Sequence, residues 1–209
     1  ENGTAGYTFW ADLRPQPPSG TAYFQSCDTP TALTTTNVLT ATINNFGSRA
    51  TLIDSNAPNY QQFDPVLASF GVNMPTLAPN GGTRCIKLNN TGGMGSSDLA
   101  TVSRYFPVIN EATLDFYFSL IMDNRPDHEQ DIQPYFRARI KDVNGNIVDE
   151  FCIIANPNNC LFSRINVSSR RRILYTGWVC ARLNVGELVG QPGILELSVS
   201  DCQPSAHFG

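Results

Sequence analysis

Short runs rich in Val, Ile, Phe, Tyr and Thr follow one another along this chain, and none of the segments between them has a sustained helical period. In one run, Phe136, Ala138 and Ile140 alternate with charged side chains, as in a strand with one buried face and one solvated face. Many short strands without helical interludes predict an all-β fold, an antiparallel, jelly-roll-like β-sandwich. The expected strands are 21–27, 37–43, 48–54, 83–90, 98–108, 113–122, 133–142, 146–155, 160–167, 176–185 and 193–201.

Turn residues separate these runs. Asn144-Gly145 between two of them is the strongest short hairpin signal, and it predicts that 133–142 folds back on 146–155. A helical turn is expected at most in 65–72, within a long proline-containing loop, 55–82, over one end of the sandwich. No linker divides the chain, so residues 1–209 are expected to form a single domain.

The charge balance excludes some classes of partner. Only 15% of residues are charged and the net charge is −4, whereas a nucleic-acid-binding surface would be basic. The exception is the run Arg170–Arg172, which is either a solvated strand end or a site for an anion or partner. No apolar run is long enough to span a membrane.

Six scattered cysteines indicate disulfide bonds in an oxidising compartment. No pair has the CxxC spacing and the chain has only two histidines, so the usual zinc sites are not expected. The sequence does not choose among the possible pairings. The favoured set is Cys152–Cys160, which would clip one loop, Cys180–Cys202 on neighbouring strands, and Cys27–Cys85.

Three stretches resemble known domains. The opening ENGTAGYTFW resembles the start of many jelly-roll modules, including carbohydrate-binding modules. The stretch DHEQDIQPYFRARIKDVNGNIV resembles a segment of jelly-roll domains in large surface proteins of Bacteroidota, which leave the cell by type IX secretion. The ending TGWVCARLNVGELVGQPGILELSVSDCQPSAHFG resembles the end of the same domains and, more loosely, the last strands of MAM domains.

The resemblance implies a non-enzymatic extracellular module of a bacterial cell-surface or secreted protein, used for adhesion or structural display. Its partner would be an extracellular surface, a glycan or a protein. The alternatives are a carbohydrate-binding module attached to a secreted enzyme and, more distantly, a glycoside hydrolase or other hydrolase. The same resemblance makes Glu1 a candidate ligand of a structural calcium ion.

Both ends of the chain fall inside these motifs, so a segment of a longer polypeptide is expected. A jelly roll that stops after 193–201 would leave a sheet edge unpaired. Either further residues or a strand donated by another polypeptide would then complete the sheet.

The loop with Asp127, His128, Glu129 and Asp131 is a candidate for hydrolytic chemistry, since glycoside hydrolysis needs two facing carboxyl groups. The chain has no nucleophile elbow, HExxH, P-loop or dinucleotide motif to support this. We therefore favour a polar corner of the sandwich, in which His128 and Gln133 bind loop backbone groups.

Exposed aromatic side chains would be needed for sugar binding. Tyr60, in the long loop, and Tyr135, on the polar face of its strand, are the candidate ligand-binding residues, whereas Trp178 is expected in the core. Three sequons matter only in a host that glycosylates: Asn2, Asn89 and Asn166.

Overall fold

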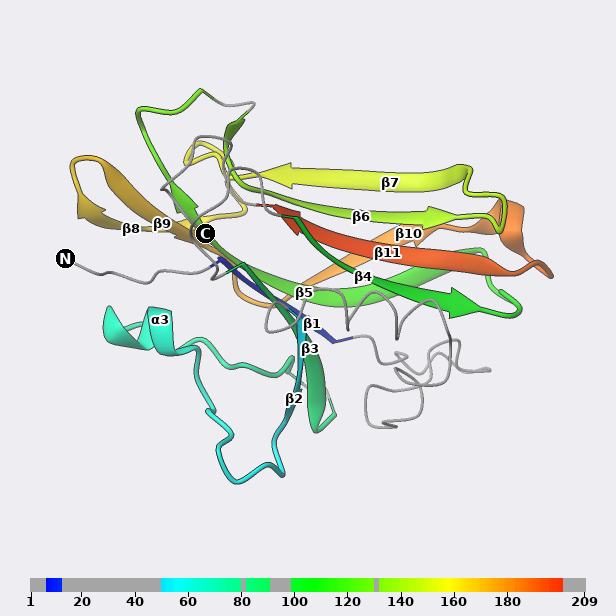
Figure 1. Cartoon of the computed structure of the whole chain (residues 1–209), viewed down its shortest axis with the longest axis horizontal. Helices are drawn as coiled ribbons and strands as arrows, with labels where there is room; N and C mark the ends of the chain where they lie inside the picture. The colour runs from blue at the N-terminus through cyan, green and yellow to red at the C-terminus, as the bar shows by residue number, and fades with distance from the viewer. Residues whose placement is uncertain (1–6, 13–49, 80–81, 91–98, 130–131, 201–209) are drawn as a thin grey trace.

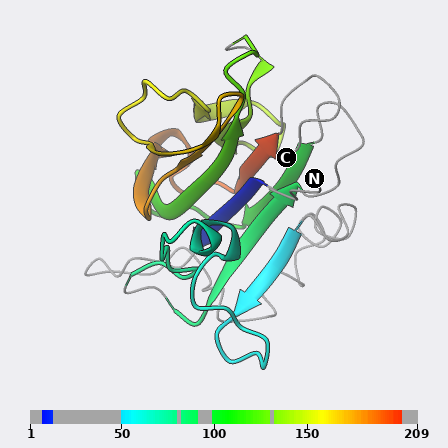
Figure 2. The same ribbon diagram turned by 90° about the vertical axis from the view of Figure 1, so that its left-hand side faces the viewer.

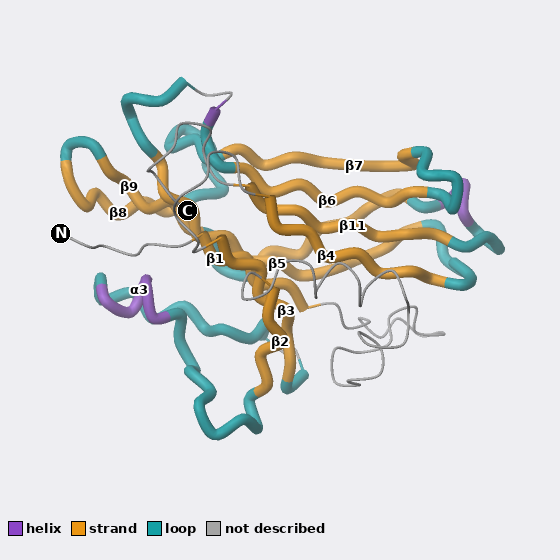
Figure 3. Tube along the Cα trace, viewed as in Figure 1, coloured by secondary structure: helices purple, strands orange, loops and turns teal. Residues whose placement is uncertain are grey.

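Two antiparallel sheets face each other in the computed structural model, which describes residues 7–12, 50–79, 82–90, 99–129 and 132–200 (Figure 1). The prediction of an all-β antiparallel sandwich is confirmed, since strands dominate the chain trace (Figure 3). One sheet has the order β4-β11-β6-β7, with bounds Leu99–Phe106, Gly193–Ser200, Tyr135–Lys141 and Ile147–Ile154.

The other sheet has seven strands in the order β2-β3-β1-β5-β9-β8, and β10 pairs with β5 beside this path. Their bounds are Ala50–Asp54, Arg84–Asn90, Tyr7–Asp12, Thr113–Asn124, Arg171–Tyr175 and Ser163–Ser168 in that order, and Val179–Asn184 for β10. A short 3-10 helix, η3 (Gly186–Leu188), leads from β10 toward β11.

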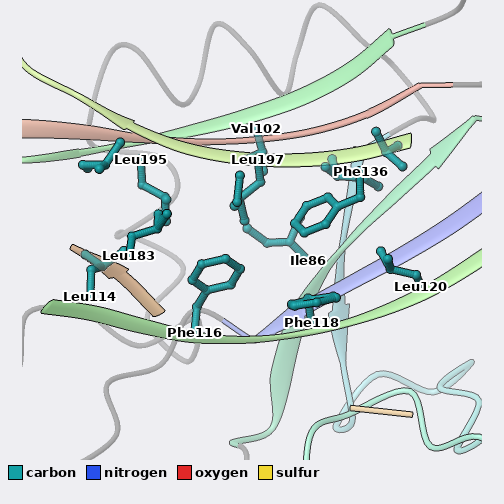
Figure 4. Close-up of a cluster of buried hydrophobic side chains, with 14 of the residues drawn as sticks. Ile86, Val102, Leu114, Phe116, Phe118, Leu120, Phe136, Leu183, Leu195 and Leu197 are labelled. Carbon is teal, nitrogen blue, oxygen red and sulfur yellow. The ribbon is translucent and has the colours of Figure 1, made fainter. Parts of the chain in front are cut away.

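The main core lies between the two sheets. Alternate residues of β5, among them Phe116 and Phe118, point inward and meet apolar side chains of β6 and β11 (Figure 4). The Phe118 ring lies 5.1 Å from the ring of Phe136 on the facing sheet. On β6 the predicted alternation is confirmed, because Phe136, Ala138 and Ile140 are buried and the residues between them are half-buried.

A second apolar cluster covers the outer face of the larger sheet. It joins Leu67 and Met74 of the long loop to Cys85, Ile121 and Ile173 of the strands. The helical turn expected in 65–72 is confirmed as α3 (Pro65–Ser69), and the Asp64 carboxylate accepts hydrogen bonds from the backbone N–H groups of Val66 and Leu67 at its start. The long loop therefore lies over a sheet face, where Figure 2 shows α3 toward the viewer.

A β-bulge occupies the first residues of the strand expected at 176–185, so that β10 begins at Val179. Tyr175 pairs with Ile121 and Val179 with Phe118, so three residues, Thr176 to Trp178, oppose only two on β5. The Thr176 hydroxyl accepts a hydrogen bond from Leu120 N at 2.9 Å, which replaces a lost ladder bond. The bulge divides one strand into β9 and β10 and lets both pair with β5.

The hairpin predicted at Asn144-Gly145 joins β6 to β7. Gly145 has a φ of 89°, a left-handed conformation that favours glycine. One carboxylate oxygen of Asp142 accepts hydrogen bonds from the backbone N–H groups of Asn144 and Asn146, both at 2.8 Å. Hydrogen bonds hold the pKa of Asp142 below its ordinary value. The largest contribution comes from the side-chain amide of Asn146, and the backbone N–H groups of Asn146 and Asn144 add to it.

We expect Gly145→Ala to lower the free energy of unfolding by about 1 to 2 kcal/mol, because an L side chain is strained in the left-handed region. No atom lies within 4 Å of the added Cβ, so backbone strain is the only direct cost. Gly177→Ala is the matched control, since it adds a methyl group with equal space and without a positive φ. Urea unfolding of both variants measures the difference, and equal stabilities would contradict the assigned turn.

The last described strand, β11, lies in the middle of its sheet and pairs with β4 on one side and β6 on the other. The expectation that further residues or a donated strand complete the sheet concerns residues that follow β11, and 201–209 lie outside the described part, so it stays a prediction. The edge strands of this sheet are β4 and β7. Among the described residues, no helix has the length and apolar character that crossing a membrane requires.

Candidate functional site

A groove of about 420 Å³ runs along the outer face of the smaller sheet beside its edge strand, β7. Tyr135, a ligand-binding candidate from the sequence, is half-buried in its wall. Because β7 is the edge strand, a ligand in the groove would contact both side chains and the backbone of that strand. Its lining residues are Gln133, Tyr135, Arg137, Glu150, Phe151, Cys152 and Ile154.

Strand register sets the chemistry of this groove. Tyr135 on β6 lies opposite Ile154 on β7, and Arg137 lies opposite Cys152. The groove therefore has an apolar end at Ile154, and charged side chains of both signs, Arg137 and Glu150, also line it. Arg137 Nε is buried and has no hydrogen-bond partner among the described residues. A buried donor without a partner costs free energy.

The Cys152 thiol is not activated as a nucleophile. Its partial burial raises its pKa and outweighs the opposing effect of the Arg137 charge. Because the thiolate is the reactive form, a raised pKa keeps this cysteine weakly reactive at neutral pH.

A cluster of ion pairs lies further along the same sheet face. Glu196 on β11 accepts hydrogen bonds from Arg139 and from Lys141, whose Nζ lies 2.8 Å away. Burial acts to raise the Glu196 pKa, but the hydrogen bonds from Lys141 and Arg139 prevail and hold it below its usual value. Arg139 and Lys141 therefore share one carboxylate, whereas Arg137 lines the groove.

The edge of β7 that does not pair with β6 lies beside β10 of the larger sheet. We call the junction between these two strands, which do not pair with each other, the seam. Val148, Phe151 and Ile153 of β7 are only partly buried where they pack against the main core. Asp149 accepts a hydrogen bond from Asn184 N on β10 at 2.7 Å, so a β7 side chain satisfies a backbone donor of the neighbouring edge. Among the described residues, no strand pairs with β7 on this side.

Tyr60, the other ligand-binding candidate, lines a second hollow of about 420 Å³ over β2 and β3. Its hydroxyl lies 3.2 Å from Thr76 Oγ1, which holds the ring beside the sheet. Lys87 also lines this hollow, and burial lowers the pKa of its ammonium group while the carboxylate of Asp64 opposes that shift. The lining residues are Leu52, Ile53, Asp54, Ala57, Asn59, Tyr60, Gln61, Pro65 and Lys87.

The loop between β5 and β6 is organised by Gln133, as predicted for a polar corner. Its amide nitrogen donates to the carbonyl oxygens of Arg125 at 2.7 Å and of His128 at 3.0 Å. Its amide oxygen accepts from Asn124 Nδ2 and from Arg125 N. Asp127 and Glu129 are exposed, and Asp131 lies outside the described residues.

A buried carboxylate that the sequence analysis missed lies at the end of β5. Asp123 is only 3% exposed and forms ion pairs with Arg171 Nε at 2.8 Å and with Arg125 Nε at 3.4 Å. Burial raises the pKa of Asp123 to about 6, against the lowering effect of the two arginines. The sequence feature that could have indicated this site is an aspartate at the end of a mostly apolar strand, Thr113–Asn124.

The described cysteines do not form the predicted bridges. Cys152, Cys160 and Cys180 carry free thiols, so neither the Cys152–Cys160 bond nor a bond from Cys180 is present. The sequence spacing gave no side-chain direction, and Cys152 points from the outer face of β7 into the groove. Cys85 is fully buried, and its thiol donates to Thr76 O at 3.1 Å. Cys27 and Cys202 lie outside the described residues.

Trp178, expected in the core, packs against the second apolar cluster, and its Nε1 donates to Pro75 O at 2.9 Å. Glu1 lies outside the described residues, so calcium at that position stays a prediction. Within the part of the chain that the structure describes, no three His, Cys, Asp or Glu side chains are grouped as metal ligands.

Comparison of the chain with protein-family models, with curated proteins and with solved structures found no match. The resemblance to jelly-roll surface domains therefore rests on the three sequence stretches alone.

Proposed function

We propose that this chain is a non-enzymatic module of an extracellular or cell-surface protein, serving adhesion or structural display, and that it binds an extended segment of a protein partner along β7. The observation that carries the proposal is the groove beside an edge strand, with the Arg137 side chain in its wall. An edge strand offers backbone N–H and C=O groups to an added strand, which is a general mode of peptide recognition.

The two faces of β7 define the partner. An added strand would turn alternate side chains toward the groove and toward the open seam. On the groove side Arg137 favours an acidic residue, because a guanidinium binds a carboxylate with charge-assisted hydrogen bonds. On the seam side Val148 and Phe151 favour apolar residues. The partner segment is therefore extended and alternates acidic with apolar residues.

A binding role is also supported by how the reactive groups are placed. The Cys152 thiol is held in its protonated form, and Asp127 and Glu129 lie exposed on a loop that Gln133 ties down by hydrogen bonds. The extracellular location, the jelly-roll topology and export by type IX secretion belong to the proposal as well. They are supported by the low lysine content and by the resemblance of the three stretches.

Carbohydrate binding is the second candidate, and the Tyr60 hollow favours it. A tyrosine ring beside the side chains of Asn59, Gln61 and Lys87 combines an aromatic wall with polar groups suited to sugar hydroxyls. Tyr60→Ala would then abolish binding in a soluble glycan screen without affecting peptide binding at β7.

We expect the full chain to bind a fluorescent eight-residue peptide in which valine alternates with glutamate, matched to the length of β7. Arg137→Met should weaken this binding about tenfold or more, since a hydrogen bond to a charged group is lost. Fluorescence anisotropy measures the affinity. Val189→Met is the control, because Val189 is 48% exposed and lies outside the groove.

A peptide of the same composition with valines and glutamates in separate blocks should bind much more weakly, because its side chains cannot divide between groove and seam. Equal binding of the two peptides, or an Arg137→Met variant that binds as the wild type does, would refute the β7 site.

A further inference from the structure

Arginine side chains gather at one corner of a molecule whose net charge is −4. The β8–β9 hairpin projects beyond the smaller sheet at this corner (Figure 1), and the loop after β5 lies against it. We call these five residues the arginine corner: Arg125, Arg164, Arg170, Arg171 and Arg172.

Pairing and hydrogen bonds hold the corner together. Arg125 and Arg171 share the buried carboxylate of Asp123, and Arg125 Nη1 donates to Arg170 O at 3.5 Å. Arg172 pairs across the ladder with Asn166, so Arg164 is its diagonal neighbour on the same face of the hairpin.

Three guanidinium groups of the corner remain available to a ligand. Arg164 and Arg170 are exposed and Arg172 is half-buried, and no described carboxylate lies within ion-pair distance of any of them. The charge of Asp123 is already used by Arg171 and Arg125. Exposed Asp127 and Glu129 lie further along the loop and reduce the local charge without pairing with these arginines.

We propose that the arginine corner binds an acidic polysaccharide through its carboxylate or sulfate groups. A guanidinium offers a planar fork of N–H donors that matches the two oxygens of such groups. Neighbouring arginines on one hairpin face could contact successive charges of a repeating chain. This inference adds a second partner to the proposed adhesive role, and it involves no residue of the β7 groove.

A nucleic acid and an anionic membrane fit the arginine corner less well than an acidic polysaccharide. The hairpin turn, Ser168-Ser169-Arg170, is polar and carries neither an aromatic ring on which a nucleic-acid base would stack nor an apolar side chain to enter a membrane. The negative net charge of the whole chain also opposes the extended contacts with phosphate that nucleic-acid binding requires.

The test measures binding of the full chain to immobilised polygalacturonate and to dextran sulfate, with uncharged dextran as the reference. We expect binding to at least one anionic polymer that weakens steeply with added salt. Arg164→Gln and Arg170→Gln should each weaken it about three- to tenfold, as expected for exposed charged contacts. Arg182→Gln is the control, since this exposed arginine pairs with Asp115 on another part of the sheet.

Equal losses with Arg182→Gln would mean that only net charge matters, and would overturn the site. Tighter binding to single-stranded DNA or to vesicles containing phosphatidylserine would overturn the class of partner. Absence of binding to both anionic polymers would overturn the inference while leaving peptide binding at β7 intact, since the two tests use different residues.

Discussion

Replacing Phe118 by alanine lowers the free energy of unfolding by about 4 kcal/mol, the largest single effect that we expect in this chain. The Phe118 side chain is 2% exposed and lies between the sheets, with the rings of Phe116, Phe136 and Phe151 at 6.2, 5.1 and 6.1 Å. The substitution removes buried apolar surface and leaves a cavity that these rings fill only partly.

Phe70→Ala is the control for this experiment. Phe70 is 42% exposed just after α3, so its truncation should cost about 0.5 kcal/mol or less. Urea unfolding followed by far-ultraviolet circular dichroism measures both variants. A Phe118→Ala cost as small as that of the control would mean that the two sheets are not packed together through this ring.

Replacing Arg171 by glutamine lowers the free energy of unfolding by about 3 kcal/mol at pH 8, because it leaves the buried Asp123 carboxylate without its closer partner. The effect should depend on pH. Burial already raises the pKa of Asp123 to about 6, and the Arg171 charge is the strongest influence that lowers it. Removing Arg171 therefore raises this pKa further above its ordinary value of 3.8.

The direction of the pH effect follows from this shift. An acid whose pKa is higher in the folded state binds its proton more tightly there, so the folded state gains relative stability as pH falls through that pKa. In Arg171→Gln the full cost of the unpaired carboxylate applies above the folded pKa, and protonation relieves it below. The difference from wild type should therefore be smaller at pH 5 than at pH 8.

Unfolding of Arg171→Gln and wild type by urea at the two pH values measures this change. Arg182→Gln serves as the control, because it breaks an ion pair of the same kind whose partner, Asp115, is not buried. A cost of Arg171→Gln that is the same at pH 5 and pH 8 would contradict the assignment of Asp123 as the coupled group.

Local patterns predicted local structure well in this chain. The alternation in β6 identified both the buried Phe136 and the half-buried Tyr135, and Asn144-Gly145 located the hairpin. These features depend on residues that are neighbours in the sequence. The two-residue period of a strand and the residue types of a turn are therefore enough to predict them.

Features that depend on distant pairing were not predictable in the same way. Asp123 and Arg171 are far apart in the sequence and meet only because β5 pairs with β9. The long loop packs on a sheet face because that face carries apolar residues such as Ile121, which look like any other strand residue in the sequence. The surroundings of Cys152 depend on which face of β7 its side chain points to, and not on its sequence spacing from the other cysteines.

The same limit applies to the candidate site. The sequence predicts Tyr60 and Tyr135 as exposed aromatics, but both are half-buried, and each lines a hollow. Nothing in the sequence indicated that Tyr135 would share its hollow with a buried Arg137 donor at a sheet edge, because the order of strands in a sheet is set by tertiary packing.

Hydrogen–deuterium exchange with the alternating valine–glutamate peptide tests the central claim, that β7 is a binding edge, most directly. Strand addition gives hydrogen bonds to backbone amides that now face an open edge. The account predicts slower exchange within 147–154 when the peptide is bound, and no change in 50–79 around the Tyr60 hollow. Protection elsewhere, with unchanged exchange in 147–154 at a peptide concentration that saturates binding, would contradict it.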